Sequence, residues 1–251
     1  LDEAAWGLLI RQARNANVLG QMLSAVEAHV SCDQWPLRAQ QSFLAEKNVA
    51  DHRYASLLCE IDVLSRALAP GNIRPVLLKG AAYALEKKPF SRFRNFGDID
   101  VLVPHNKLNE VERLLLASGW LTTKVDEYDQ MYYRRWMHEL PPMRHIHRGT
   151  NLDVHHAILP LTARYKPDSG ILLASVRQSS GLPSVDILCP EDMFLHGAAH
   201  LFCEGESENS LRNLLDLRNL WIDSFTDKNS VVVLVNRAVE LDLTVVLALA
   251  G

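Results

Sequence analysis

Two aspartates stand one residue apart in the apolar stretch GDIDVLV, residues 97–103. Successive side chains of a β-strand point to opposite faces, so Asp98 and Asp100 share one face and the apolar residues between them take the other. Buried carboxylates about 6–7 Å apart along a strand repel each other and are costly unless they are paired or bind a cation. The pair therefore predicts a positive partner, with a divalent metal ion as the natural candidate. The alternative is a solvated strand end in which Asp98 caps the turn after Gly97.

A third acidic residue lies in NLDVHHAIL, residues 151–159, where strand periodicity puts Asp153 and His155 on one face. Carboxylates from adjacent strands form the oxygen-rich site that Mg²⁺ prefers, together with substrate phosphates. Two metal ions held in this way stabilise both the attacking and the leaving oxygen of a phosphoryl or nucleotidyl displacement. We therefore expect Asp98, Asp100 and Asp153 to be catalytic, to bind metal and to converge on one cleft. His155 would orient a phosphate or the acceptor.

The stretch LLKGAAYAL, residues 77–85, predicts a strand that turns at Gly80 into a helix. The backbone N–H groups at a helix N-terminus suit a phosphate group. Gly80 and Ala81 are small enough to let a phosphate approach, and Lys79 supplies a positive charge beside it. The alternative is an ordinary strand–helix turn with a surface lysine. The acidic strands that follow the turn favour a phosphate-binding role over this alternative.

Histidines concentrate in the second half of the chain. His196 and His200 in HGAAH have the i, i+4 spacing of a helical zinc pair, but the glutamate of a metalloprotease is missing, which favours an interface between the C-terminal helices and the core. His145 and His147 in RHIHR either face phosphates across the cleft or belong to a polar edge strand, which we favour. Arg212 and Asp216, also four residues apart, predict an ion pair on one helix.

The elements that must position these residues fall into three parts. Apolar residues at helical spacing predict a helical region over 1–70, with helices at 4–30 and 38–69, the second closed by PGN. Residues 71–165 alternate short strands with helices, and residues 166–251 return to a mainly helical pattern. This order predicts the α+β class: a small mixed β-sheet with helices on one side, flanked by helical regions that wall the cleft.

Composition excludes several classes of protein. The chain has 251 residues, 48% of them hydrophobic, and a formal net charge of −4, so no global basic field indicates a nucleic-acid or anionic-membrane partner. The four cysteines form no CxxC pair and predict buried thiols in a reducing compartment. The apolar run VVVLV is too short for a membrane span. These features predict a cytoplasmic location.

Four blocks together resemble the uncharacterised nucleotidyltransferase family of bacteria within the polymerase-β-like superfamily: VLLKGAAYAL, RFRNFGDIDVLV, LDVHHAI and PEDMFLHGAAHLF…LRNLLDLRNL, over roughly residues 55–225. The resemblance implies a nucleotidyltransferase core in which Asp98, Asp100 and Asp153 hold two Mg²⁺ ions. It also places the nucleotide triphosphate on the turn at Lys79, Gly80 and Ala81, and matches Arg94 to a family arginine that meets the triphosphate. The alternative interpretation of Arg94 is an arginine in a surface loop. Most superfamily members have Gly-Ser in the turn, so this chain lacks the serine hydroxyl there.

The resemblance implies a transferase that moves a nucleoside monophosphate from an NTP to an acceptor and releases pyrophosphate. ATP is the expected NTP, and Mg²⁺ or Mn²⁺ is the expected cofactor. The acceptor could be a small molecule, a protein or RNA, for which Arg134, Arg135, Arg144 and Arg148 offer a local basic strip. Two alternatives stay open: a non-catalytic nucleotide-binding regulator and a metal-dependent phosphohydrolase. A third carboxylate favours an enzyme, because a binding module does not need it.

Overall fold

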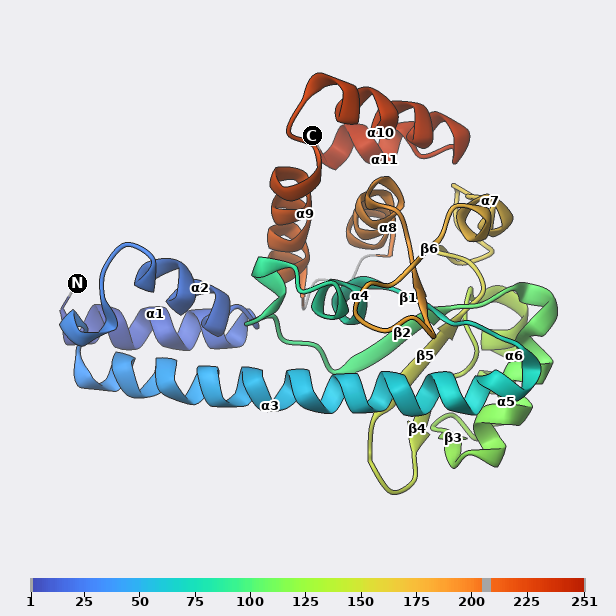
Figure 1. Ribbon diagram of the computed structural model, residues 1–251, viewed down its shortest axis with the longest axis horizontal. Coiled ribbons are helices and arrows are strands. Elements are labelled where there is room, and N and C mark those ends of the chain that lie inside the picture. The colour runs from blue at the N-terminus through green and yellow to red at the C-terminus, as the bar shows by residue number, and fades with distance from the viewer. Residues whose placement is uncertain (1, 205–208, 251) are drawn as a thin grey trace.

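The computed structural model describes residues 2–204 and 209–250. Three N-terminal helices open the chain (Figure 1): α1 (Glu3–Asn15), α2 (Leu19–Glu27) and α3 (Leu37–Leu68). The single helix expected over 4–30 is wrong, because Asn17 adopts a left-handed conformation with φ of +56° and separates α1 from α2. Asparagine tolerates this conformation better than most residues, whereas hydrophobic periodicity does not reveal it. The long second helix and its end before PGN are confirmed.

A seven-stranded mixed sheet forms the centre of the protein, in the order β3-β4-β5-β2-β1-β7-β6. Its pairs β2–β5 and β1–β7 are parallel, and the other four are antiparallel. The strands are β1 (Val76–Leu77), β2 (Asp98–Leu102), β3 (Trp120–Thr122), β4 (Met143–His145), β5 (Asn151–His155), β6 (Arg177–Gln178) and β7 (Asp186–Ile187). The expected α+β class with a mixed sheet is confirmed.

The strand that contains His145 is not at the edge of the sheet. β4 pairs with β3 on one side and with β5 on the other, and His145 is buried. The expectation of a polar edge strand is therefore wrong, because the following hairpin returns the chain directly into β5 and the earlier β3 covers the remaining edge.

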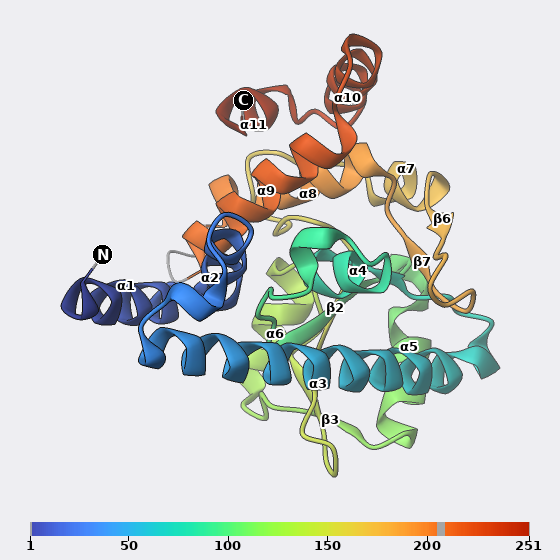
Figure 2. The same ribbon diagram turned by 60° about the vertical axis from the view of Figure 1, so that its left-hand side comes forward.

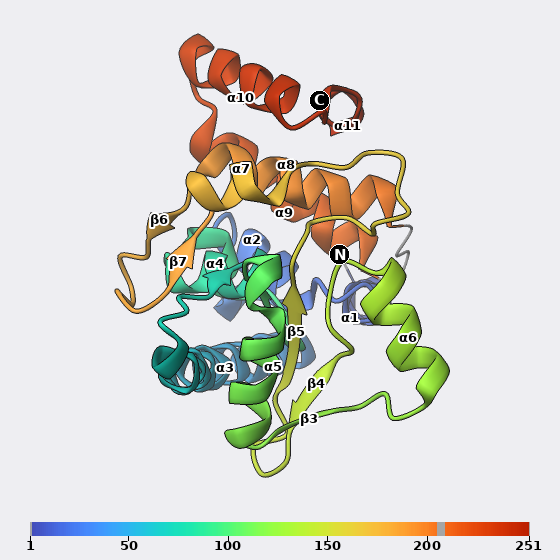
Figure 3. The same cartoon turned by 90° about the vertical axis from the view of Figure 1, so that its right-hand side faces the viewer.

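Helices lie on both faces of the sheet (Figures 1 and 3). Figure 3 shows α3 and α5 on one face and α6 on the other, so the expected one-sided arrangement is wrong. The C-terminal helices α8 and α9 cross one end of the sheet, and α10 and α11 pack beyond them (Figure 2). The remaining helices are α4 (Lys79–Leu85), α5 (Leu108–Ala117), α6 (Glu127–Trp136), α7 (Ser169–Ala174), α8 (Pro190–Cys203), α9 (Ser210–Ser224), α10 (Lys228–Glu240) and α11 (Thr244–Ala250). No described helix is long and apolar enough to cross a membrane.

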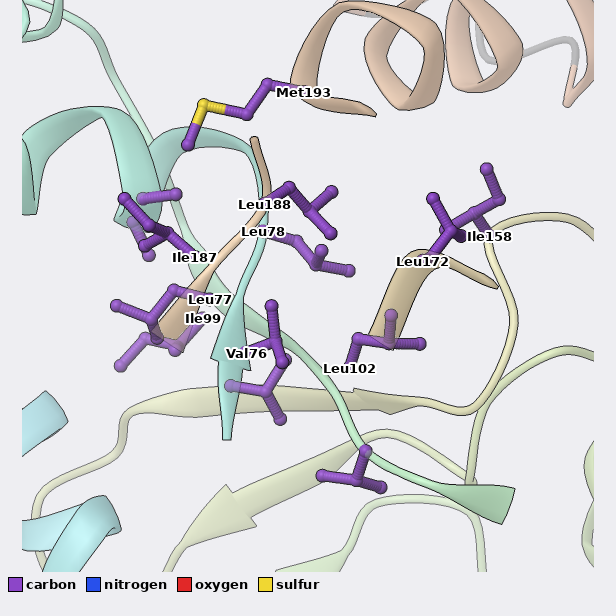
Figure 4. Close-up of a cluster of buried hydrophobic side chains, with 14 of the residues drawn as sticks. Val76, Leu77, Leu78, Ile99, Leu102, Ile158, Leu172, Ile187, Leu188 and Met193 are labelled. Atoms are coloured by element: carbon purple, nitrogen blue, oxygen red, sulfur yellow. The ribbon is translucent and has the colours of Figure 1, made fainter. Parts of the chain in front are cut away.

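One large hydrophobic core runs from α3 through the sheet to the C-terminal helices. Figure 4 shows part of this core, where apolar residues of β1, β2 and β7 pack beside Met193 of α8. The N-terminal helices have a second cluster around Trp6, Trp35 and Phe43, which also contacts Phe93 before β2 and Leu215 on α9. Because burying a large apolar side chain contributes about 1.5–3 kcal/mol, this packing holds the central strands firmly in place.

Candidate active site

The three predicted aspartates converge on one cavity. β2 and β5 pair in parallel, and the register sets Asp100 opposite Asp153 and Asp98 opposite Asn151. Residues opposite each other on paired strands point to the same face, so the three carboxylates share it. Asp98, Asp100 and Asp153 all line a cavity of about 530 Å³. The geometric expectation from the sequence therefore holds.

The walls of this cavity come from the sheet, the helix α6 and the C-terminal helices. α6 contributes Tyr132 and Tyr133, α8 contributes His200, and α9 contributes Arg212 and Asn213. None of the described residues of the N-terminal helices lines it. The expectation that both helical regions wall the cleft is thus right only for the C-terminal one, because α3 packs on the opposite face of the sheet.

Lys79 supplies the positive charge beside Asp100. Its Nζ atom lies 3.1 Å from Oδ1 of Asp100, and it begins α4 with φ of +44°. Burial by itself raises the pKa of Asp100, but Lys79 and a hydrogen bond from His155 outweigh it and hold that pKa well below its usual range. Burial likewise lowers the pKa of Lys79, yet Asp100 and Glu204 raise it above its ordinary value. The two groups therefore form a charged pair inside the cavity.

The other two carboxylates are not compensated in this way. Burial, and then the charge of Asp100, raise the pKa of Asp153 to about 7. Partial desolvation at the cavity wall, and then the charge of Asp100, also raise the pKa of Asp98, although this residue is exposed at the start of β2. No backbone amide among the described residues donates to the Asp98 side chain, so the alternative of a capped turn is not observed. This set of oxygen donors fits a hard divalent cation such as Mg²⁺.

Glu139 and His138 complete the site, although the sequence did not single out their roles. Nε2 of His155 donates to Oδ1 of Asp100 at 3.1 Å, and Nδ1 of His155 lies 3.5 Å from Oε2 of Glu139. Burial, together with His155, lowers the pKa of His138 to about 2, so that ring is neutral at pH 7. Both residues follow α6 in an irregular segment, where no periodicity indicates which way a side chain points.

Arg94 is a buried residue and not the surface loop arginine of the alternative interpretation. It is 5% exposed, and its Nε atom donates to Oδ2 of Asp216 at 2.6 Å. The predicted ion pair between Arg212 and Asp216 is therefore wrong: Arg212 donates instead to the backbone oxygen of Asn95 at 3.0 Å. Arg94 and Arg212 both line the cavity beside Lys79, which gives it one basic wall.

Gly80 is small because Arg94 occupies the space beside it. A Cβ atom built on Gly80 would lie 2.1 Å from Nη1 of Arg94. Ala81 is 2% exposed and packs in the hydrophobic core, so the small residues of the turn serve the packing of Arg94 and the core directly. Lys79 and Gly80 line the cavity, whereas Ala81 is not among the residues that do.

We expect Gly80→Ala to lower the free energy of unfolding by about 3 kcal/mol, since the new methyl group must displace a buried, ion-paired guanidinium. At roughly 2–4 °C per kcal/mol for a chain of this size, the melting temperature should fall by about 6–12 °C in a calorimetric scan. Gly97→Ala is the matched control, because a Cβ atom there has no neighbour within 4 Å. Equal melting temperatures for the two variants would contradict the close contact.

The remaining histidine and arginine motifs lie apart from the carboxylates or serve packing. His196 is 2% exposed, and burial and then Lys79 lower its pKa well below the usual value. This placement agrees with an interface role for His196, and among the described residues neither it nor His200 joins a group of three metal-binding side chains. Within the basic strip, Arg134 pairs with Glu112 at 2.5 Å and Arg148 with Glu60 at 2.7 Å.

Comparison with solved structures finds similar chains at low identity. Crystallised ANT(2'')-Ia in complex with adenylyl-2''-tobramycin is 14% identical, with a TM-score of 0.48 over 72% of this chain and 94% of the other. A nucleotidyltransferase-like protein from Paracoccidioides brasiliensis is 18% identical, with a TM-score of 0.42 over 76% and 92%. A search of curated proteins finds no match.

The sequence profile described as uncharacterised nucleotidyltransferase matches residues 2–250. This match spans nearly the whole chain and extends well beyond the four sequence blocks that carry the resemblance. The chain belongs to the uncharacterised nucleotidyltransferase family and is a nucleotidyltransferase.

Proposed function

We propose that this enzyme transfers a nucleoside monophosphate from an NTP to an acceptor hydroxyl or phosphate in a reaction that depends on Mg²⁺. The expected NTP is ATP. The observation that supports this most is the placement of Asp98, Asp100 and Asp153 on one face of β2 and β5 inside a single cavity. Three carboxylates at such close quarters destabilise one another unless a cation compensates their charge. The same donor set would accept Mn²⁺.

The three carboxylates would divide the work. Asp98 and Asp100, two residues apart on β2, would hold both metal ions, and Asp153 would hold the catalytic one from β5. When bound, Mg²⁺ would stabilise the negative charge that develops on the attacking and leaving oxygens. Asp153 would also help to activate the acceptor, whose oxygen bonds to the α-phosphorus as the bond to the β-phosphate breaks and pyrophosphate leaves.

The basic wall would bind the triphosphate. Lys79 and Arg94 lie on the same side of the cavity, and Gly80 between them brings the backbone close to that wall. His155 would position a phosphate or the acceptor through the ring that contacts Asp100. Ala81 would act only through its backbone, since its side chain is buried.

The size of the cavity favours a small acceptor or a single side chain over a long nucleic acid. A volume of about 530 Å³ falls in the range of small-molecule sites. The basic strip lies outside this cavity, and two of its arginines are neutralised by Glu60 and Glu112. The experiment therefore compares RNA, protein and small molecules as acceptors, and we expect a small molecule.

The function is tested by incubating the full chain with each α-³²P-labelled NTP, Mg²⁺ or Mn²⁺, and size-fractionated cell extract. Label on an acceptor together with released pyrophosphate supports the transferase. Label released as free nucleotide would show a phosphohydrolase, and bound but unreacted NTP would show a regulator. Fractions that contain only small metabolites, protein or RNA identify the class of acceptor.

Lys79→Ala should weaken NTP binding by about 1–3 kcal/mol, the scale of a charge-assisted hydrogen bond to phosphate. This corresponds to roughly 5- to 150-fold in Kd, measured by calorimetry on protein that circular dichroism shows to be folded. Lys107→Ala is the control, because Lys107 pairs with Glu110 of α5 and is not among the residues that line the cavity. Unchanged affinity in Lys79→Ala would move the triphosphate to another part of the protein.

A further inference from the structure

A cluster of two histidines and one glutamate lies beside the aspartates and has a different chemistry. His138, Glu139 and His155 each offer a donor atom, and these atoms lie within 4.8 Å of one another. His138 is 4% and His155 is 3% exposed. An isolated β-bridge joins Glu139 to His155, so the backbone fixes the separation of these two residues. Imidazole nitrogens with one carboxylate suit borderline transition metals, whereas the oxygen-only aspartates suit Mg²⁺.

The contacts of His155 follow the pattern of metal-binding histidines, whereas His138 has a carboxylate of Glu204 near its Nε2 atom but beyond hydrogen-bond distance. Such a histidine usually presents one ring nitrogen to the metal and donates from the other to a carboxylate. Nε2 of His155 faces Asp100 at 3.1 Å, and Nε2 of His138 faces Oε1 of Glu204 at 3.6 Å. Nδ1 of both rings is buried and has no hydrogen-bond partner within residues 2–204 and 209–250. Buried polar atoms without a partner are rare, so two in one cluster indicate a ligand.

The space between His155 and Glu139 also calls for a cation. In the neutral His155 ring whose Nε2 carries the proton donated to Asp100, Nδ1 carries a lone pair. That lone pair faces Oε2 of Glu139 at 3.5 Å, which is itself an acceptor. Two acceptors opposed in a largely buried site repel each other, and a metal ion between them would remove this repulsion.

We propose that His138, Glu139 and His155 form a second metal site, for a borderline divalent transition metal with Zn²⁺ as the preferred ion. Small side-chain rotations would draw the donor atoms to the roughly 2.0–2.2 Å of zinc bonds. Bound at Nδ1 of His155, the ion fixes the tautomer whose Nε2 donates to Asp100. The second site would therefore orient a carboxylate of the proposed Mg²⁺ site without belonging to it. A His155 ring bound in this way has no nitrogen left for a phosphate or the acceptor, so this site excludes that role of His155 but leaves the nucleotidyl transfer proposed for the aspartates unaffected.

The test is a titration of the chelator-treated full chain with Co²⁺, whose visible absorption reports nitrogen ligands, in excess Mg²⁺ that occupies the aspartates. One equivalent of Co²⁺ should give an absorption band that Zn²⁺ abolishes. His138→Ala and Glu139→Gln should each raise the apparent Kd at least about 100-fold, beyond the range for residues that only support metal ligands. Because Glu139→Gln preserves the shape of the side chain, it keeps the test valid if His138→Ala does not fold.

Two control variants separate this site from its neighbours. His156→Ala should retain the band, since the His156 ring packs against His105 with ring centroids 4.8 Å apart and lines a different cavity. Asp98→Asn should retain it too while losing transferase activity, so failure of either proposal is visible without the other. The absence of a band in the wild type, a band unchanged in His138→Ala and Glu139→Gln, or a band lost in Asp98→Asn would overturn the second site.

Discussion

Asp98→Asn is expected to lower nucleotidyl transfer at least about 1000-fold in a protein that remains folded. Asparagine keeps the shape of the side chain and removes the negative charge that would hold the metal ions. Metal stabilisation of a transferring phosphoryl group contributes several kcal/mol, and each 1.36 kcal/mol is a factor of ten in rate. No hydrogen bond to the Asp98 side chain is found across the described part of the chain, so folding should not depend on it.

The measurement is the initial rate of label transfer from α-³²P-NTP, with circular dichroism as the test of folding. Asp51→Asn is the matched control: its carboxylate is 66% exposed and pairs with the surface residue Arg92 at 3.4 Å. It should retain the wild-type rate. Wild-type activity in Asp98→Asn would show that this carboxylate does not take part in catalysis.

The same substitution at Asp100 and Asp153 should have opposite effects on the stability of the metal-free protein. Repulsion between neighbouring aspartates, read from the sequence alone, predicts that Asp100→Asn melts at the same temperature or higher. The structure reverses this expectation, because Asp100 is the partner of Lys79 at 3.1 Å and of His155. Removing one partner of a buried ion pair costs about 3 kcal/mol or more, which lowers the melting temperature by roughly 6–12 °C.

Asp153→Asn should instead raise the melting temperature. Burial and the charge of Asp100 raise the pKa of Asp153 to about 7, so at pH 8 the folded state carries an unfavourable negative charge. The unfolded chain has no such penalty, and the amide removes it from the folded state. Calorimetric scans at pH 8 with a chelator compare the three proteins directly. A rise in the melting temperature of Asp100→Asn would contradict the pairing of Lys79 with Asp100, and a fall in that of Asp153→Asn would contradict the uncompensated charge of Asp153.

A sizeable part of the fold could be predicted from local patterns. Alternation in GDIDVLV and NLDVHHAIL placed Asp98, Asp100, Asp153 and His155 on strands that the structure confirms as β2 and β5. Helical periodicity with the stop signal PGN located α3, since this long helix keeps one face in the core. These features depend on neighbours within one or two turns of the chain.

The short strands could not be predicted in the same way. β3, β6 and β7 have two or three residues each, too few for a period to be recognised. They exist because a neighbouring strand satisfies their backbone hydrogen bonds. His138 and Glu139 were missed for a related reason: their segment reaches the cavity through backbone contacts with the end of β5, among them the bridge between Glu139 and His155.

By itself, the sequence determined which residue types share a face and therefore which carboxylates could act together. The tertiary structure alone decided what compensates each charge. Arg94 forms an ion pair with Asp216, which lies 122 positions along the chain, although Arg212 is on the same helix as Asp216. Lys79 forms an ion pair with Asp100. The physical reason is that periodicity orients a side chain relative to its own strand or helix. The partner of a buried charge is chosen by desolvation and by distances between elements far apart in sequence.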